Sequence, residues 1–338
     1  MASATNKREQ CTQNGQDSSK ILADDFLPLI QSRCDEWIAN LKSPNIDKIY
    51  SAIKSGKMLR SKLVFAILGQ KLSNPKSIDS TFSTDILDSA ISLCAVIELV
   101  QCASLLHDDV IDEAKMRRGV PSVNATFGNK NAIMLGDVLY SKAYFHLVDF
   151  PLSIAKSISN AVCALSRGEI DDVIYSREFQ PSVEVYYKIL EDKTASLIAS
   201  SAESSAILAG LESSKYYEYG KNLGLAFQIV DDLLDITQDE ATLGKPSMND
   251  LAEGKSTLPY ILLYEKLDFA TKEEFLSHFY KRDSAAIEWF RKSFDTYKII
   301  QNTQKIAQDF IKKALNAIKD EQNPTLVQIA TSMIDRRF

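Results

Sequence analysis

Two clusters of aspartates have the residue types and the spacing of a metal site. Asp108, Asp109 and Asp112 end a long apolar segment, in the run LLHDDVIDE. Residues four apart project from one face of a helix, so Asp108 and Asp112 share a face with Asp109 alongside. Neighbouring carboxylates repel one another and are costly to desolvate, and a hard cation such as Mg²⁺ removes both costs. A solvated acidic helix end is the alternative for one cluster of this kind.

The same spacing occurs again and favours the metal site. Asp231, Asp232 and Asp235 follow a second apolar run, GLAFQIV. Two such triads facing each other across a helical bundle would hold several Mg²⁺ ions and a diphosphate.

Basic residues around these motifs provide charge for anions. Lys57 and Arg60 are three apart, and Lys115, Arg117 and Arg118 follow the first triad directly. Each is, by itself, more typical of a solvated surface, but together they predict two anion sites, because arginine binds phosphate as a planar fork and lysine as a point charge. The further donors in the sequence are Lys193 with Thr194, Lys245 and Lys255.

Long helices must position these side chains. The 338 residues include only 12 glycines and 9 prolines, and 45% are hydrophobic. Residues 84–113 contain neither glycine nor proline and are apolar on nearly all sides, which predicts a central helix. Ser43 and Pro44 predict a helix start, and Gly56 a left-handed residue ending that helix. We expect an all-α fold, a single large helical bundle over residues 20–338, after a disordered polar tail at residues 1–19.

Charge and cysteine content exclude several classes of protein. Lys and Arg number 39 against 45 Asp and Glu, a net charge of −6, so no basic field indicates nucleic acid. The 5 cysteines show no CxxC spacing, which favours reduced thiols of a cytoplasmic protein. No apolar stretch approaches the roughly 18 residues that span a bilayer, so we expect no transmembrane segment.

The motifs resemble those of the trans-isoprenyl (polyprenyl) diphosphate synthases, in particular long-chain members of the octaprenyl type. The resemblance extends from about Phe26 to the C-terminus. It depends on SGKMLRSKL, ELVQCASLLHDDVIDEAKMRRGVPSVN, MLGDVLYSKA, EDKTASL and GLAFQIVDDLLDITQDEATLGKPSMNDLAEGKSTLP. Departures are few: the family's GGKRLRP appears as SGKMLRSK, Gln101 stands where many members have histidine, and Glu169 and Asp172 replace parts of a motif and are given no role.

The resemblance implies roles for individual residues. The metal ligands would be Asp108, Asp109, Asp112, Asp231, Asp232 and Asp235, holding two or three Mg²⁺ ions. Isopentenyl diphosphate would be bound by Lys57, Arg60, Gln101 and Arg118. The allylic diphosphate would be bound by Arg117, Lys193, Thr194, Gln228, Lys245 and Lys255, with Lys193, Thr194 and Gln228 also acting in catalysis. Members of the family are usually homodimers.

The implied reaction is ionisation, condensation and elimination. Departure of the allylic diphosphate leaves a carbocation, the isopentenyl double bond attacks it, and loss of a proton gives an alkene one isoprene unit longer. The expected product is a long-chain all-trans polyprenyl diphosphate for quinone side chains. Two alternatives are a short-chain synthase making farnesyl or geranylgeranyl diphosphate and a noncatalytic partner subunit that binds prenyl diphosphate.

Product length depends on the residues before the first triad. In this family, bulky aromatics in the last turn before that motif close a central apolar tunnel, whereas Ala103 and Ser104 are small. Val100 and Ile97 lie on successive turns of roughly the same face. Tyr144 or Phe145 is the predicted floor. Close helix packing is the alternative reason for the two small residues.

Overall fold

The computed structural model describes residues 23–72, 80–238, 248–281 and 283–334. Within these ranges the chain is almost entirely helical, and its strands are a two-residue pair, β1 (Met116–Arg117) and β2 (Val120–Pro121). The N-terminal half contains η1 (Ala23–Phe26), α2 (Leu27–Ala39), α3 (Pro44–Tyr50), α4 (Leu59–Leu72), α5 (Ser80–Ile111), α6 (Val123–Phe127), α7 (Asn129–Leu147) and α8 (Leu152–Tyr175). The C-terminal half contains α9 (Val183–Leu190), η2 (Glu191–Ala195), α10 (Ser196–Ala209), α11 (Ser213–Thr237), α13 (Asn249–Glu253), α14 (Leu258–Lys266), α15 (Phe269–His278), α16 (Ser284–Thr296), α17 (Ile299–Ala317) and α18 (Pro324–Ile334). The all-α bundle is confirmed, whereas the predicted tail at residues 1–19 lies outside the described residues.

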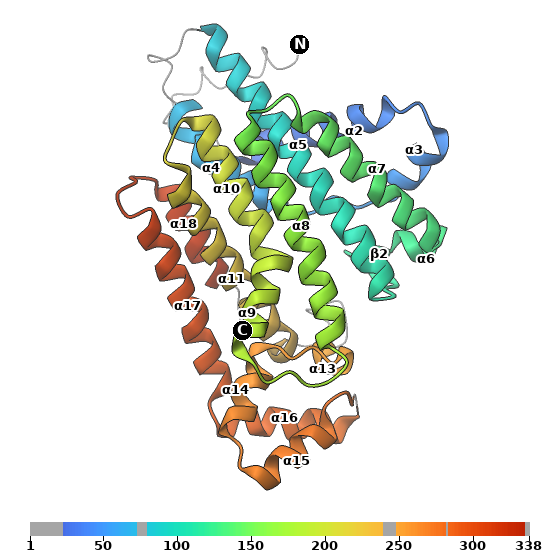
Figure 1. Cartoon of the computed structure of the whole chain (residues 1–338), viewed down its shortest axis with the longest axis vertical. Coiled ribbons are helices and arrows are strands. Elements are labelled where there is room, and N and C mark those ends of the chain that lie inside the picture. Colours follow the sequence, from blue (N-terminus) through green and yellow to red (C-terminus); the bar gives the residue numbers. More distant parts are fainter. Residues whose placement is uncertain (1–22, 73–79, 239–247, 282, 335–338) are drawn as a thin grey trace.

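Helix α5 is the centre of the N-terminal half, as its pattern predicts. It packs against α2, α4, α7, α8 and α10, and Figure 1 shows it between α4 and α7. Ile97 and Val100 are completely buried. A helix that is apolar all round has no face to offer to water, so it is enclosed by its neighbours.

The expectation that no apolar stretch is long enough to span a membrane was wrong for α5. Among the described residues, Ile86–Ile111 passes that test by length and composition, with a mean hydropathy of 1.9. The most apolar part of this segment is 61% buried inside the protein. Its apolar character is therefore explained by packing in the core.

Helices α10 and α11 approach each other closely because glycines line their contact. A Cβ on Gly220 would lie 2.7 Å from the Cα of Ala199, and one on Gly224 would lie 2.6 Å from the Cα of Ala195. Close approach of the backbones fixes the rotation of α11, which carries the second aspartate triad at its C-terminal end.

The helix-start prediction at Ser43 is confirmed, but the prediction for Gly56 was wrong. Ser43 caps α3 by accepting a hydrogen bond from the Ile46 amide, and Pro44 is the first helical residue. Gly56 lies outside the left-handed region and beyond the end of α3. A Cβ at Gly56 would lie 2.5 Å from Nη2 of Arg118, so glycine is needed there for close approach of that guanidinium.

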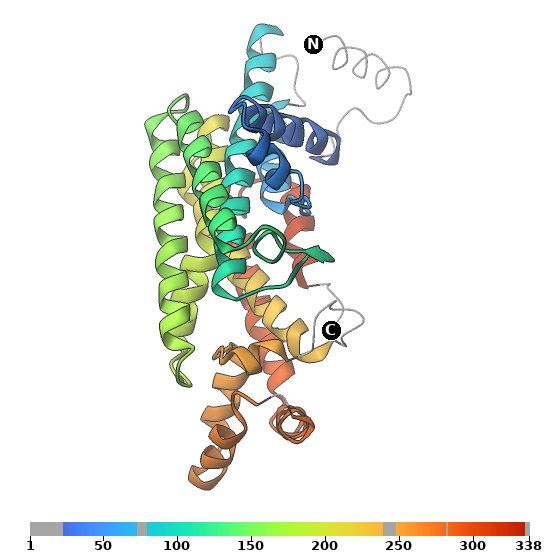
Figure 2. The ribbon, with the colours of Figure 1, turned by 90° about the vertical axis from the view of Figure 1, so that its right-hand side faces the viewer.

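Helices α7 and α8 form one outer layer of the bundle, as the perpendicular view in Figure 2 shows. Several large apolar side chains of these helices and of the turn between them are exposed: Ile133, Met134, Phe145, Val148, Leu152, Ile170, Val173 and Ile174. We call this set the α7–α8 face. Its exposed apolar character is typical of a surface that binds a partner.

Candidate active site

Lys193 and Lys255 lie beside the second aspartate triad and close to carboxylates of the first, and we call the space around these two lysines the cleft. Lys193 Nζ is 2.7 Å from Oε2 of Glu169 and 2.6 Å from Oδ2 of Asp172, both on α8. Burial and the Glu169 carboxylate raise the pKa of Asp108 to about 7, and Lys193 opposes this rise. Asp108 therefore lies close to both Glu169 and Lys193. The structure therefore gives Glu169 and Asp172, which the sequence left without a role, direct contact with Lys193.

Lys255 lies among carboxylates of the first triad and of helix α13, which follows the second triad in the chain. Its Nζ is 2.7 Å from Oε2 of Glu253. Burial by itself would lower the pKa of Lys255, but the carboxylates of Asp112, Glu253 and Asp250 hold it above its ordinary value. Asp112 makes the largest of these contributions, so Lys255 lies close to the carboxylate that ends the first triad.

A cavity of about 290 Å³ opens beside the second triad. Its walls come from α8, α9, η2, α11 and the segment after α13. The sequence-predicted residues that line it are Lys193, Thr194, Gln228, Asp231, Asp232, Asp235 and Lys255. Lys245 lies outside the described residues.

A π-helical turn aims Lys193 and Thr194 into this cavity. The turn, η2, is fixed through Asp192, which is 2% exposed and accepts two hydrogen bonds from Arg167 of α8, at 2.7 and 2.6 Å. Gly168 permits the approach of α8, because a Cβ there would lie 2.7 Å from the backbone nitrogen of Lys193. π-turns inside helices are frequent at functional sites.

Asp232 is held inside a chain of hydrogen bonds. Thr194 Oγ1 donates to Gln228 Oε1 at 3.0 Å, and Gln228 Nε2 donates to Asp232 Oδ1 at 3.0 Å. The hydroxyl of Tyr186 donates to Asp232 Oδ2 at 2.7 Å. Sequence reasoning missed Tyr186, since no local spacing links residue 186 to residue 232.

Asp109 and Arg117 form a second internal pair, on the other side of the first triad. Asp109 is 3% exposed, and Arg117 Nε donates to its Oδ1 at 2.8 Å. Arg118 and Gly119, between β1 and β2, both have positive φ, 54° and 77°, the combination of a type I′ turn. This tight hairpin places Arg117 against Asp109 and Arg118 against the Lys54 carbonyl.

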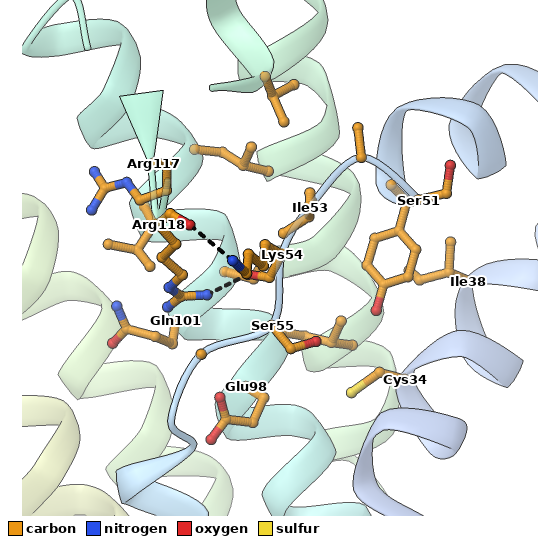
Figure 3. Close-up of a pocket in the computed structure, with 18 of the residues that line it drawn as sticks. Cys34, Ile38, Ser51, Ile53, Lys54, Ser55, Glu98, Gln101, Arg117 and Arg118 are labelled. Atoms are coloured by element: carbon orange, nitrogen blue, oxygen red, sulfur yellow. Dashed lines mark hydrogen bonds between the residues drawn. The ribbon is translucent and has the colours of Figure 1, made fainter. Parts of the chain in front are cut away.

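A second cavity, of about 530 Å³, lies between α2, α3, α5 and the β1–β2 hairpin. Gln101, Arg117 and Arg118 line it, and Figure 3 shows Arg118 pointing between Gln101 and the 51–58 loop. Arg118 Nη1 donates to the Lys54 carbonyl at 2.6 Å, and Lys54 Nζ donates to the Arg118 carbonyl at 3.2 Å. These bonds fasten the hairpin to the loop, so two distant segments form one cationic wall.

Arg60 and Glu98 lie next to this wall. Burial and the nearby Arg118 lower the pKa of Arg60 to about 10, whereas Glu98 opposes this shift. The Nε atom of Arg60 is buried and has no hydrogen-bond partner. Burial raises the pKa of Glu98, which accepts a hydrogen bond from Ser61 Oγ at 2.6 Å. Lys57 is exposed. The buried, unpartnered donor of Arg60 suits an anion, and Glu98 is a further residue that sequence reasoning missed.

The predicted chain-length residues do not share one environment. Ala103, Val100 and Ile97 are fully buried and Ser104 is 8% exposed, all within the core around α5. Phe145 is 64% exposed and Tyr144 is 37% exposed, so this chain by itself encloses neither of them, and the predicted floor at these residues stays a prediction. The tunnel stays a prediction.

Comparison with known proteins supplies the family. The sequence pattern of the polyprenyl synthetases matches residues 44–297 of this chain. This protein belongs to the polyprenyl synthetase family. It is similar to the crystal structure of octaprenyl pyrophosphate synthase from Helicobacter pylori, with 49% identity, coverage of 93% of this chain and 99% of the other, and a TM-score of 0.86.

Two further similar proteins are also polyprenyl synthases by name. The mitochondrial solanesyl-diphosphate synthase 1 of Oryza sativa subsp. japonica is 32% identical over 95% of this chain and 77% of the rice protein. A polyprenyl synthase of Caulobacter crescentus, crystallised with calcium and isoprenyl diphosphate, is 26% identical with a TM-score of 0.78, covering 95% of this chain and 98% of the other. The polyprenyl synthetase fold therefore covers nearly all of this chain.

Proposed function

We propose that this polyprenyl synthetase is a prenyltransferase that condenses isopentenyl diphosphate with an allylic diphosphate, such as farnesyl diphosphate, into a long-chain all-trans polyprenyl diphosphate. The observation that carries the proposal is the pair of neighbouring anion sites. One is the cleft around Lys193 and Lys255. The other is the cavity lined by Gln101, Arg117 and Arg118, with Arg60 next to it. Two substrates that each carry a diphosphate require two such sites.

The donor set of the cleft fits Mg²⁺. Among the described residues no three acidic or metal-binding side chains converge as a closed cage. Mg²⁺ does not need one, because it is usually bound by one or two carboxylates, with water and phosphate oxygens in its other positions. We assign this role to Asp108, Asp112, Asp231 and Asp235, with two or three ions. Asp109 and Asp232 accept side-chain hydrogen bonds from Arg117 and from Tyr186 and Gln228, and Asp235 accepts one from the backbone amide of Asp250. Bound Mg²⁺ supplies Lewis-acid stabilisation of charge on the departing diphosphate.

The protein residues bind and orient the reacting groups. Lys193 and Lys255 attract the diphosphate of the allylic substrate, whose C1–O bond breaks with the electron pair remaining on oxygen. Thr194 and Gln228 present oxygen atoms beside the allylic cation that is left. The double bond of isopentenyl diphosphate, held at Arg60, Gln101 and Arg118, forms the new carbon–carbon bond. A proton then leaves to the released diphosphate and the new double bond forms.

Two features support a long product. Ala103 and Ser104 place little bulk one turn before Asp108. The similar proteins named above include an octaprenyl and a solanesyl diphosphate synthase. An aromatic residue at either position would favour the short-chain alternative.

The function is tested by incubating the purified chain with Mg²⁺, farnesyl diphosphate and labelled isopentenyl diphosphate, and then sizing the dephosphorylated products. We expect products longer than geranylgeraniol, and no product when a chelator removes the metal. Products that stop at geranylgeraniol would indicate a short-chain synthase. A chain that binds both substrates but forms no product would indicate a noncatalytic partner subunit.

We also propose that the protein is a homodimer, with the α7–α8 face as the contact. The face joins two neighbouring helices and is rich in exposed apolar side chains. A second copy would cover Phe145 and Val148, which are 64% and 77% exposed in one chain.

A further inference from the structure

Tyr186 links α9 to the second aspartate triad through a buried hydrogen bond that the chemistry above leaves unexplained. The residue is 5% exposed, and its hydroxyl donates to Asp232 Oδ2 at 2.7 Å. Gln228 occupies the other oxygen of the same carboxylate, at 3.0 Å. Both oxygens of Asp232 are therefore held by donors of this chain.

These donors come from different elements. Tyr186 is on α9, Gln228 is on α11, and Thr194, which holds the amide of Gln228, is in the π-turn. Asp232 is 4% exposed and lies between Asp231 and Asp235 on the same helix. Loss of a donor to a buried carboxylate leaves an oxygen without a partner, so the side chain must turn or admit water.

We propose that Tyr186 is a positioning residue that fixes the side chain of Asp232 and, through it, the last turns of α11, which carry Asp231 and Asp235. The inference rests on the proposed function, because it makes Tyr186 a support of the metal–diphosphate site. Tyr186 acts through Asp232 and takes no part in bond making or breaking. Supports of this kind usually change metal affinity or activity by about 10- to 100-fold when removed.

The chain contains a matched control for this tyrosine. Tyr219 is on α11, is fully buried, and donates its hydroxyl to the Leu326 carbonyl at 2.7 Å. The Tyr186→Phe and Tyr219→Phe variants each remove one buried hydroxyl bond of the same length. Only the first removes a bond to the aspartate motif.

The experiment measures Mg²⁺-dependent binding of inorganic diphosphate to the full-length chain by calorimetry, together with the thermal unfolding midpoint and the KM for isopentenyl diphosphate. We expect Tyr186→Phe to raise the half-saturating Mg²⁺ concentration by about tenfold or more. The Tyr219→Phe variant should keep the wild-type Mg²⁺ requirement, and neither change should alter the KM for isopentenyl diphosphate. A folded Tyr186→Phe protein with the wild-type Mg²⁺ requirement overturns the proposal.

A second pair of variants keeps the test decisive if Tyr186→Phe does not fold. Asn at position 232 keeps the shape of the side chain and one acceptor oxygen for Gln228 Nε2, and its NH2 can donate to the Tyr186 hydroxyl, which can also accept. Asp232→Asn should therefore weaken Mg²⁺-dependent diphosphate binding less than Asp231→Asn does. Equal losses in the two variants would overturn the positioning role. A wild-type chain that neither binds diphosphate with Mg²⁺ nor forms product contradicts the proposed function itself, whereas failure in the variants alone contradicts only this inference.

Discussion

At the scale of single residues, the two proposed anion sites differ in the charged side chains around them. In the cleft, Lys193 and Lys255 lie among carboxylates that raise their pKa values against the effect of burial. Next to the second cavity, Arg60 has a lowered pKa, because burial and the nearby Arg118 oppose its charge. The cleft thus combines acidic and basic groups, as the proposed metal–diphosphate site requires, whereas we propose that the arginines at the second cavity bind a diphosphate without a metal.

We expect Arg118→Gln to raise the KM for isopentenyl diphosphate by about 10- to 100-fold, since a hydrogen bond to a charged group contributes roughly 1.5–3 kcal/mol. The KM for the allylic substrate should stay within about twofold of the wild type. Steady-state kinetics with each substrate varied in turn measure both values. Lys48→Gln, which removes an exposed cation on the nearby helix α3, is the control. An equal rise in both KM values would contradict the separation of the two sites.

At the scale of the elements, the π-turn is held by close packing of α8. Ala at position 168 would bring a Cβ to 2.7 Å from the Lys193 backbone nitrogen, so the turn or the helix must shift. We expect Gly168→Ala to cost about 1–3 kcal/mol of unfolding free energy and to raise the KM for the allylic substrate. Denaturant unfolding and kinetics measure the two effects.

Gly69→Ala is the matched control on helix α4. A Cβ at Gly69 meets nothing within 4 Å, so alanine should stabilise the helix by roughly 0.5–1 kcal/mol without affecting kinetics. If Gly168→Ala behaved like Gly69→Ala, close packing of the π-turn would not control Lys193.

We propose that helix α5 presents different faces to the product and to the second cavity. Phenylalanine in place of Ser104 would add bulk to the face that continues to Val100 and Ile97, so we expect Ser104→Phe to shorten the product. Leu105, the next residue, lines the second cavity, and Leu105→Phe should leave product length unchanged. Chromatography of the dephosphorylated products compares the two variants, and an unchanged distribution in Ser104→Phe would refute the predicted path of the chain.

For the whole molecule, the α7–α8 face determines the expected assembly. We expect the double substitution Phe145→Glu and Val148→Glu to convert a dimer into a monomer, because two carboxylates would be desolvated at the contact. Light scattering gives the mass in solution. Phe269→Glu, at an 80% exposed position on α15, is the control that should leave the mass unchanged. A wild-type monomer, or a dimer that survives both changes, would contradict this contact.

Local patterns predicted the all-α fold, the central helix and the positions of both triads, because each depends on spacing within one helix. Contacts between distant segments were not predictable in the same way. Tyr186 reaches Asp232, and Gly56 lies against Arg118, only after the bundle has formed. The exposure of Phe145 also depends on which face of α7 the bundle leaves uncovered.

The most direct test of the account is whether the two triads act on one diphosphate. We predict that Asp108→Asn and Asp231→Asn each lower kcat/KM by about 100-fold or more. The kcat/KM of the double variant should be only slightly below that of the less active single variant, because the effects of residues that act as a unit do not add. The unfolding midpoint should stay close to that of the wild type. Near-normal turnover in either folded single variant would contradict the account.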